Sequence, residues 1–213
     1  MRNKFDEQLN ELNDAMIEMG NIIIVSISRA IEALKTKDST LAQKIMEEDL
    51  EVDRLQKRIE SICFNLLIQQ QPVARDLRNV TAALKMVTDM ERIGDHAADI
   101  SEMTIMMSSD SHIDKFENII KMASETLIML NHSIESYVEK DKEKAQSVIT
   151  FDDIIDDLFL KSRKDILELI IKNPVDGEEA MDLLMVAKYF ERIGDHATNI
   201  AEWVIYSLTG EVA

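Results

Sequence analysis

Residues 91–102 read ERIGDHAADISE and residues 191–202 read ERIGDHATNIAE, so seven consecutive residues recur unchanged 100 positions later. A helix turns about 100° per residue, which places Ile93, Ala97 and Ile100 on one face of the first copy. The acidic residues of the same copy fall on the opposite face. Each copy therefore predicts an amphipathic helix, and the repetition predicts a chain built from two matching halves.

Helical periodicity extends over most of the 213 residues, and helix breakers are rare, with five Gly and two Pro. Thr40 to Gln43 and Ser111 to Asp114 have capping-box spacing, and Asp141 is a candidate helix cap. We therefore predict six helices. Three lie near residues 5–34, 40–69 and 73–107, and three begin after Ser111, Asp141 and Asp176, the last ending near Leu208.

Each half then contains three amphipathic helices whose apolar stripes must be buried against one another. The sequence predicts an all-α fold of six long helices in two tandem three-helix bundles. The Ser-rich stretch at 108–111 is the best linker, so we place the two domains at residues 1–109 and 110–213.

The charge of the chain limits its partners. The net charge is −17, which disfavours nucleic acid and anionic lipid headgroups as partners and favours cations and basic surfaces.

The single Cys63 lies in an apolar run and is expected to be a small buried hydrophobe. No signal-peptide pattern or membrane-length apolar run is evident, so we expect a cytoplasmic protein without membrane insertion.

Carboxylates form a strip along the helix that contains the first copy. Glu91, Asp95, Asp99 and Glu102 all fall within about 80° of one another on a helical wheel. Like charges at this spacing cost an isolated helix roughly 0.2–0.5 kcal/mol per pair. No Lys or Arg stands at these positions, although Arg92 borders the strip. Such a strip needs either solvent or bound cations to balance it.

The preceding helix carries acids at matching heights. Asp53 and Glu91 each lie 19 residues from Pro72, and Asp49 and Asp95 each lie 23 residues from it. In an antiparallel helical hairpin, equal distances from the turn mean equal heights. In the second half, Asp156 and Glu191 lie 18 and 17 residues from Pro174, and Asp152 and Asp195 lie 22 and 21 residues from it.

Four carboxylates at one level in each hairpin predict a site for hard cations such as Mg²⁺, Ca²⁺, Mn²⁺ or Fe³⁺. A solvated acidic face is the alternative for each cluster. His96 and His196 lie about 100° from the neighbouring Asp and fit boundary residues bonded to a nearby helix better than metal ligands. Gly94 and Gly194 indicate close helix packing or room beside the acids.

The doubled motif, the tandem halves and the acidic pairs resemble the PhoU family over the whole chain. The resemblance implies two three-helix bundles with multinuclear metal clusters on their surfaces, iron or zinc in described members. The ligand positions that it implies are Asp49, Asp53, Glu91 and Asp95 in the first half and Asp152, Asp156, Glu191 and Asp195 in the second, with Asp99, Glu102, Asn199 and Glu202 as additional ligands. Asn199 departs from the acid at Asp99, so the two sites are expected to differ.

The resemblance also implies a function and partners. PhoU-type proteins repress phosphate-starvation signalling by contacting the ATPase subunit of a phosphate ABC transporter and a PhoR-type sensor kinase. We expect the same of this chain, as a homodimer and not as an enzyme. Three alternatives stay open: a structural or chaperone-like helical adaptor, a di-iron carboxylate enzyme, and a relative that serves another phosphate permease. The sequence lacks the Glu-x-x-His pairs that a di-iron carboxylate enzyme typically uses.

Overall fold

The computed structural model describes residues 2–70, 74–107 and 116–211. The described residues form long helices joined by short connections, with no strand among them. The helices are α1 (Arg2–Thr36), α2 (Ser39–Gln70), α3 (Ala74–Met106), α4 (Glu117–Glu139), α5 (Lys142–Lys172) and α6 (Gly177–Thr209), with a short 3-10 helix η2 (Pro174–Asp176) before α6.

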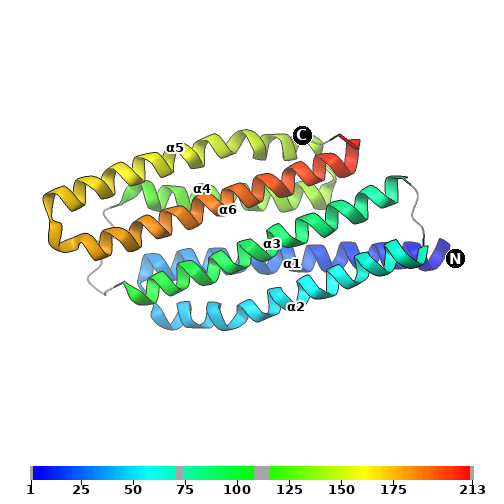
Figure 1. Ribbon diagram of the computed structural model, residues 1–213, viewed down its shortest axis with the longest axis horizontal. Coiled ribbons are helices and arrows are strands. Elements are labelled where there is room, and N and C mark those ends of the chain that lie inside the picture. The colour runs from blue at the N-terminus through cyan, green and yellow to red at the C-terminus, as the bar shows by residue number, and fades with distance from the viewer. Residues whose placement is uncertain (1, 71–73, 108–115, 212–213) are drawn as a thin grey trace.

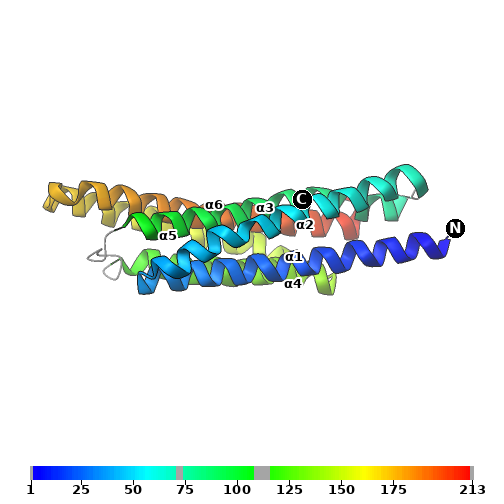
Figure 2. The same ribbon diagram turned by 90° about the horizontal axis from the view of Figure 1, so that it is seen from below.

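The helices group as the repeat predicts. Helices α1, α2 and α3 pack on one another, as do α4, α5 and α6, and contacts of α3 with α6 and of α1 with α4 join the two groups. In Figure 1, α3 and α6 run side by side through the centre while α2 and α5 flank them; Figure 2 places α1 and α4 beneath this pair. The prediction of six helices in two three-helix bundles is confirmed.

The motif helices α3 and α6 run antiparallel, so the α2–α3 and α5–α6 hairpin tips lie at opposite ends of the molecule (Figure 1). Their apolar faces form the centre of the core, where Ile93, Ile193 and Ile200 are completely buried.

Cys63 is also buried, and burial raises the pKa of its thiol to about 12. The prediction of an inert, hydrophobic cysteine therefore agrees with its surroundings.

Helix starts were predicted less well. Asp38, not Thr40, caps α2, because its Oδ1 accepts hydrogen bonds from the backbone N–H groups of Thr40 and Leu41 at 3.0 Å. Asp accepts such bonds at this position as well as Ser or Thr does, and the helix begins at Ser39. Asp141 caps α5 as predicted, accepting from Glu143 and Lys144.

Three predictions lie outside the described residues: the capping box of Ser111, the domain boundary between residues 109 and 110, and the side chain of Asp176. Whether each bundle is an independent domain stays a prediction. Over the described residues, no helix combines the length and the apolar character that crossing a membrane requires.

Candidate metal site

The first acidic cluster forms where α2 packs against α3. Asp49 and Asp53 come from α2, and Glu91 and Asp95 come from α3. Burial and then the charges of Asp95, Asp53 and Glu91 raise the pKa of Asp49 from 3.8 to about 6. Burial and Asp95 also raise the pKa of Glu91. The structure therefore brings these four carboxylates into one electrostatic neighbourhood.

The second cluster repeats this arrangement where α5 packs against α6. Asp152 and Asp156 come from α5, and Glu191 and Asp195 come from α6. Burial, followed by the charges of Asp195 and Asp156, raises the pKa of Asp152 to about 6. Burial and Glu191 raise the pKa of Asp195. Carboxylates that resist ionisation in this way gain from any cation that enters.

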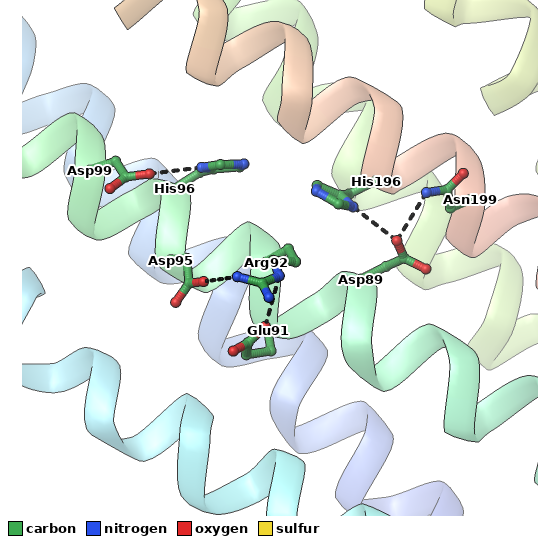
Figure 3. Close-up of polar contacts among 8 residues, drawn as sticks. All are labelled: Asp89, Glu91, Arg92, Asp95, His96, Asp99, His196 and Asn199. Carbon is green, nitrogen blue, oxygen red and sulfur yellow. Dashed lines mark hydrogen bonds and ion pairs between the residues drawn. The ribbon is translucent and has the colours of Figure 1, made fainter. Parts of the chain in front are cut away.

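Each cluster contains one basic side chain, which corrects the expectation of a strip free of cations. Arg92 contacts Asp95 Oδ2 through Nη1 at 3.0 Å and Glu91 Oε2 through Nε at 3.5 Å (Figure 3). In the second half, Lys188 pairs with Glu191. Long basic side chains reach back along a helix to acids three residues away, which wheel positions alone do not reveal. Among the described residues, the four carboxylates of each cluster outnumber the basic side chain that pairs with them.

Two glycines allow the helices to approach at the clusters. A Cβ on Gly94 would lie 2.9 Å from Val52 Cγ1 and 3.2 Å from Asp49 Oδ1. A Cβ on Gly194 would lie 3.3 Å from Asp152 Oδ1 and 3.4 Å from Ile155 Cγ2. Both interpretations of these glycines, close helix packing and room beside the acids, therefore apply. Because glycine has no Cβ, the helices can approach closely and an acidic side chain fits beside them.

The two histidines face each other between α3 and α6, with ring centroids 5.8 Å apart (Figure 3). His96 Nδ1 lies 2.9 Å from Asp99 Oδ2 on its own helix. His196 Nδ1 lies 2.8 Å from Asp89 Oδ1 on α3, and the Asn199 amide donates to the same oxygen at 3.0 Å. The expectation of a histidine bonded to a nearby helix is confirmed for His196, whereas the partner of His96 is local.

Asp89 and its counterpart Tyr189, 100 residues later, were missed by the sequence reasoning. Asp89 bonds His196, and the Tyr189 ring lies 5.5 Å from the His96 ring. Each residue therefore reaches across to the histidine of the other half. Both residues stand two positions before the motif, ahead of Glu91 and Glu191, and this shared position was the available signal. The two residues differ, however, so a search for repeated residues does not find them.

An open groove of about 760 Å³ crosses the α3–α6 seam and joins parts of both clusters. The sequence predicts one cluster on the wall of each bundle; the groove instead connects them, because α3 and α6 pack against each other. The groove is lined by Asp49, Arg92, Asp95, His96, Ala98, Asp99, Arg192, Asp195, His196 and Asn199.

Five of the twelve predicted ligand positions line the groove, and the other seven do not; the five are Asp49, Asp95, Asp99, Asp195 and Asn199. Asp99 and Asn199 line the groove but are engaged with His96 and Asp89. Glu102 and Glu202 do not line it. Within the described part of the chain, no three His, Cys, Asp or Glu side chains converge as they stand on a point that could hold a metal ion. The donor chemistry fits a hard cation, and capture requires the carboxylates to rotate toward it.

Comparisons with known proteins agree on one family. The sequence model of the PhoU domain matches residues 16–104 and 119–204. A phosphate-specific transport system accessory protein PhoU homolog of Clostridium acetobutylicum is 36% identical over 99% of this chain and 96% of that protein. A homolog of the same name, numbered 1, from Thermotoga maritima is 32% identical over 97% of this chain and 90% of that protein.

Solved structures agree as well. The crystal structure of PhoU from Pseudomonas aeruginosa matches with a TM-score of 0.90 at 27% identity, covering 97% of this chain and 100% of that one. The phosphate transport system regulatory protein PhoU from Streptococcus pneumoniae matches with a TM-score of 0.90 at 28% identity, covering 98% and 99%.

Proposed function

We propose that this chain, which belongs to the PhoU family, is a metal-binding accessory protein that regulates phosphate uptake and phosphate-starvation signalling. The names of its relatives, accessory and regulatory proteins of phosphate transport, support the physiological part. The two acidic clusters support metal binding. The chain is proposed to act by contact, in the cytoplasm, on the ATPase subunit of a phosphate transporter and on its sensor kinase, as a homodimer and without catalysis.

The observation that carries metal binding is that both hairpins bring four carboxylates together across two helices, with Asp49 Oδ1 and Asp152 Oδ1 packed beside Gly94 and Gly194. In keeping with this crowding, the pKa of Asp49 and of Asp152 is raised to about 6. Crowded, half-buried carboxylates disfavour their own charge, and a divalent or trivalent ion removes this cost. Asp49, Asp53, Glu91 and Asp95 would hold the metal in the first half, and Asp152, Asp156, Glu191 and Asp195 in the second. Iron or zinc is the family expectation, while the all-oxygen donors also suit Mg²⁺, Mn²⁺ or Ca²⁺.

The alternative of a metal-free helical adaptor draws support from Arg92 and Lys188, which each balance part of one cluster. A di-iron carboxylate enzyme draws none from the site, because the groove lined by Asp49, Asp95, Asp99 and Asp195 is open and is not the dry interior that buries substrate.

Elemental analysis of the untagged chain, purified without chelator, separates these functions. We expect Asp49→Asn with Asp53→Asn to lower the metal content per chain by about half, since one of two sites loses two carboxylate charges. Glu47→Gln with Glu51→Gln is the matched control, because these exposed acids lie four residues apart on the same helix. A metal-free wild type whose stability is unchanged by chelator would favour the adaptor.

The proposed contacts with the transporter ATPase and the sensor kinase are measured separately, on the same wild-type chain and cluster variant. From phosphate-rich cells of the native host, gentle crosslinking should recover the wild-type chain with a transporter ATPase or a sensor kinase. The cluster variant should recover less of either if metal organises the docking surface. Metal-loaded wild type that captures neither partner would contradict the regulatory part and leave metal binding intact.

A further inference from the structure

A second cavity, of about 490 Å³, lies at the end of the molecule where α1, α3, α4 and α6 meet. Its lining comes from residues 9–13 of α1, 75–82 of α3, 137–140 at the end of α4 and 204–208 of α6. Its volume falls within the range of small-molecule sites, roughly 300–1,000 Å³. Arg78 and Asp95 are 17 residues apart on α3, about 25 Å along the helix, so this cavity is separate from the acidic clusters.

The charge of this cavity is opposite to that of the chain. Arg75, Arg78 and Lys140 line it, and no Asp or Glu does, although the net charge of the chain is −17. The Arg and Lys ion pairs of the described residues use other side chains, and none involves these three. The basic members of those pairs are Arg29, Arg58, Arg92, Lys144, Lys161, Lys172 and Lys188.

Arg78 is the most constrained of the three cations. Its Nε is buried and has no hydrogen-bond partner within the described part of the chain. Gly210, with φ of +83°, lies so close that a Cβ there would be 3.4 Å from this nitrogen. A guanidinium carries five N–H donors and cannot lose its charge, so a buried donor without a partner is unfavourable. An oxyanion is the ligand that relieves this cost best.

The walls around these cations are partly apolar. Leu12, Ala82 and Val204 line the cavity as buried core residues. The amides of Asn10 and Asn79 add hydrogen-bonding groups at the same site. A ligand that fills this space therefore combines an anionic group with an apolar body.

The repeat supplies an internal comparison. Positions 178 and 179, 100 residues after Arg78 and Asn79, are Glu178 and Glu179. At that end, burial and then these two carboxylates raise the pKa of Asp182. The helical position of Arg78 is thus cationic at one end of the molecule, whereas its counterpart Glu178 is acidic at the other, so the cationic lining does not follow from the repeat.

We propose that this cavity binds a small organic anion, in which a phosphate or carboxylate group is held by Arg75 and Arg78 and an apolar body packs beside Val204. Two guanidinium groups bind such oxyanions in a fork geometry that a lysine does not reproduce. The lining comes from both halves of the chain, so an occupied cavity would tie α3 to α4 and α6. The ligand would stabilise the contact between the bundles.

Titration of the full chain with 8-anilinonaphthalene-1-sulfonate, a fluorescent anion with an apolar body, tests this site. We expect saturable binding that Arg78→Gln weakens about tenfold or more, the loss of one charged hydrogen-bonding group. Arg75→Gln, at an exposed position, should also weaken binding and guards against misfolding of the first variant. Arg163→Gln, the same charge change on an exposed face of α5, should leave the affinity unchanged.

Competition then identifies the anion. Displacement of the probe by phenyl phosphate or by benzoate assigns the phosphate or the carboxylate class. Equal displacement by inorganic phosphate would overturn the requirement for an apolar body. No saturable binding, or an equal loss in all three variants with helix content intact by circular dichroism, would overturn the site.

Discussion

The two acidic clusters are copies in sequence, yet their surroundings differ where the two halves of the molecule touch. In the first, the His96 side chain is 8% exposed and takes its carboxylate from Asp99 on the same helix. In the second, the His196 side chain is 23% exposed and takes its carboxylate from Asp89 in the other half. A repeat can keep its motif and still diverge, because residues at the shared seam meet different neighbours.

This difference explains the exchange of Asp99 for Asn199. Asp89 occupies the space beside His196, so a second carboxylate at 199 would face it, whereas the Asn199 amide donates a hydrogen bond to it. At the equivalent place beside His96, the other half offers the Tyr189 ring in place of a carboxylate. Among the described residues, each histidine thus has one carboxylate partner at hydrogen-bond distance, and α3 supplies both, Asp99 within its own half and Asp89 across the seam.

The largest effect on stability is expected from replacing Asn199 by Asp, which makes the two halves alike at this position. Asn199→Asp should destabilise the chain by about 2 kcal/mol, since a hydrogen bond is lost and a like charge appears beside Asp89. Chemical denaturation measures the free energy of unfolding. Adding Asp89→Asn to this variant should recover much of the loss, and a double-mutant cycle without coupling would contradict the pairing.

A smaller effect on stability should distinguish the α2–α3 contact at Gly94 from the α5–α6 contact at Gly194. Gly94→Ala forces a Cβ against Val52 at 2.9 Å and should cost about 1 kcal/mol, overpacking outweighing the gain in helix propensity. At Gly194 the nearest atom would lie at 3.3 Å, so Gly194→Ala should be close to neutral. The difference in thermal midpoint between the two variants measures this. Equal shifts would mean that both hairpins pack with the same clearance.

The smallest effect tests what the clusters share. In metal-free protein, the pKa of Asp49 and of Asp152 is raised from 3.8 to about 6, so folding favours the protonated forms. The stability that these groups contribute is complete below pH 3.8 and is lost as the pH rises through about 6. Asp49→Asn and Asp152→Asn should each stabilise the chain at pH 8 by less than about 1 kcal/mol after solvent screening, and not at pH 3.5.

Denaturation of both variants in chelator, at the two pH values, checks this expectation, with Glu47→Gln as a control for an exposed acid. A gain in one half alone would show that the clusters differ in crowding as well as in their neighbours. A gain that persists at pH 3.5 would assign the effect to packing and not to charge.

Much of the site was predictable because a helix has a fixed rise and a fixed turn. Those two constants put Glu91 level with Asp53, and Asp95 level with Asp49, once the hairpin around Pro72 was recognised. The side-chain partners were not predictable in this way. Arg92 and Lys188 bend back to neighbouring acids, and Asp38 takes the cap predicted for Thr40, because flexible or short polar side chains choose among several nearby groups.

Local periodicity and distance from a turn were enough to predict the six helices, the two halves and the level of the eight acids. Helix packing sets three features that no such pattern predicts: α3 and α6 run antiparallel, Asp89 and Tyr189 reach across to the histidines, and Arg75 and Arg78 share a cavity with Lys140. These contacts join residues about 60 to 110 positions apart, and packing between buried helix faces, not any local pattern, sets their distances.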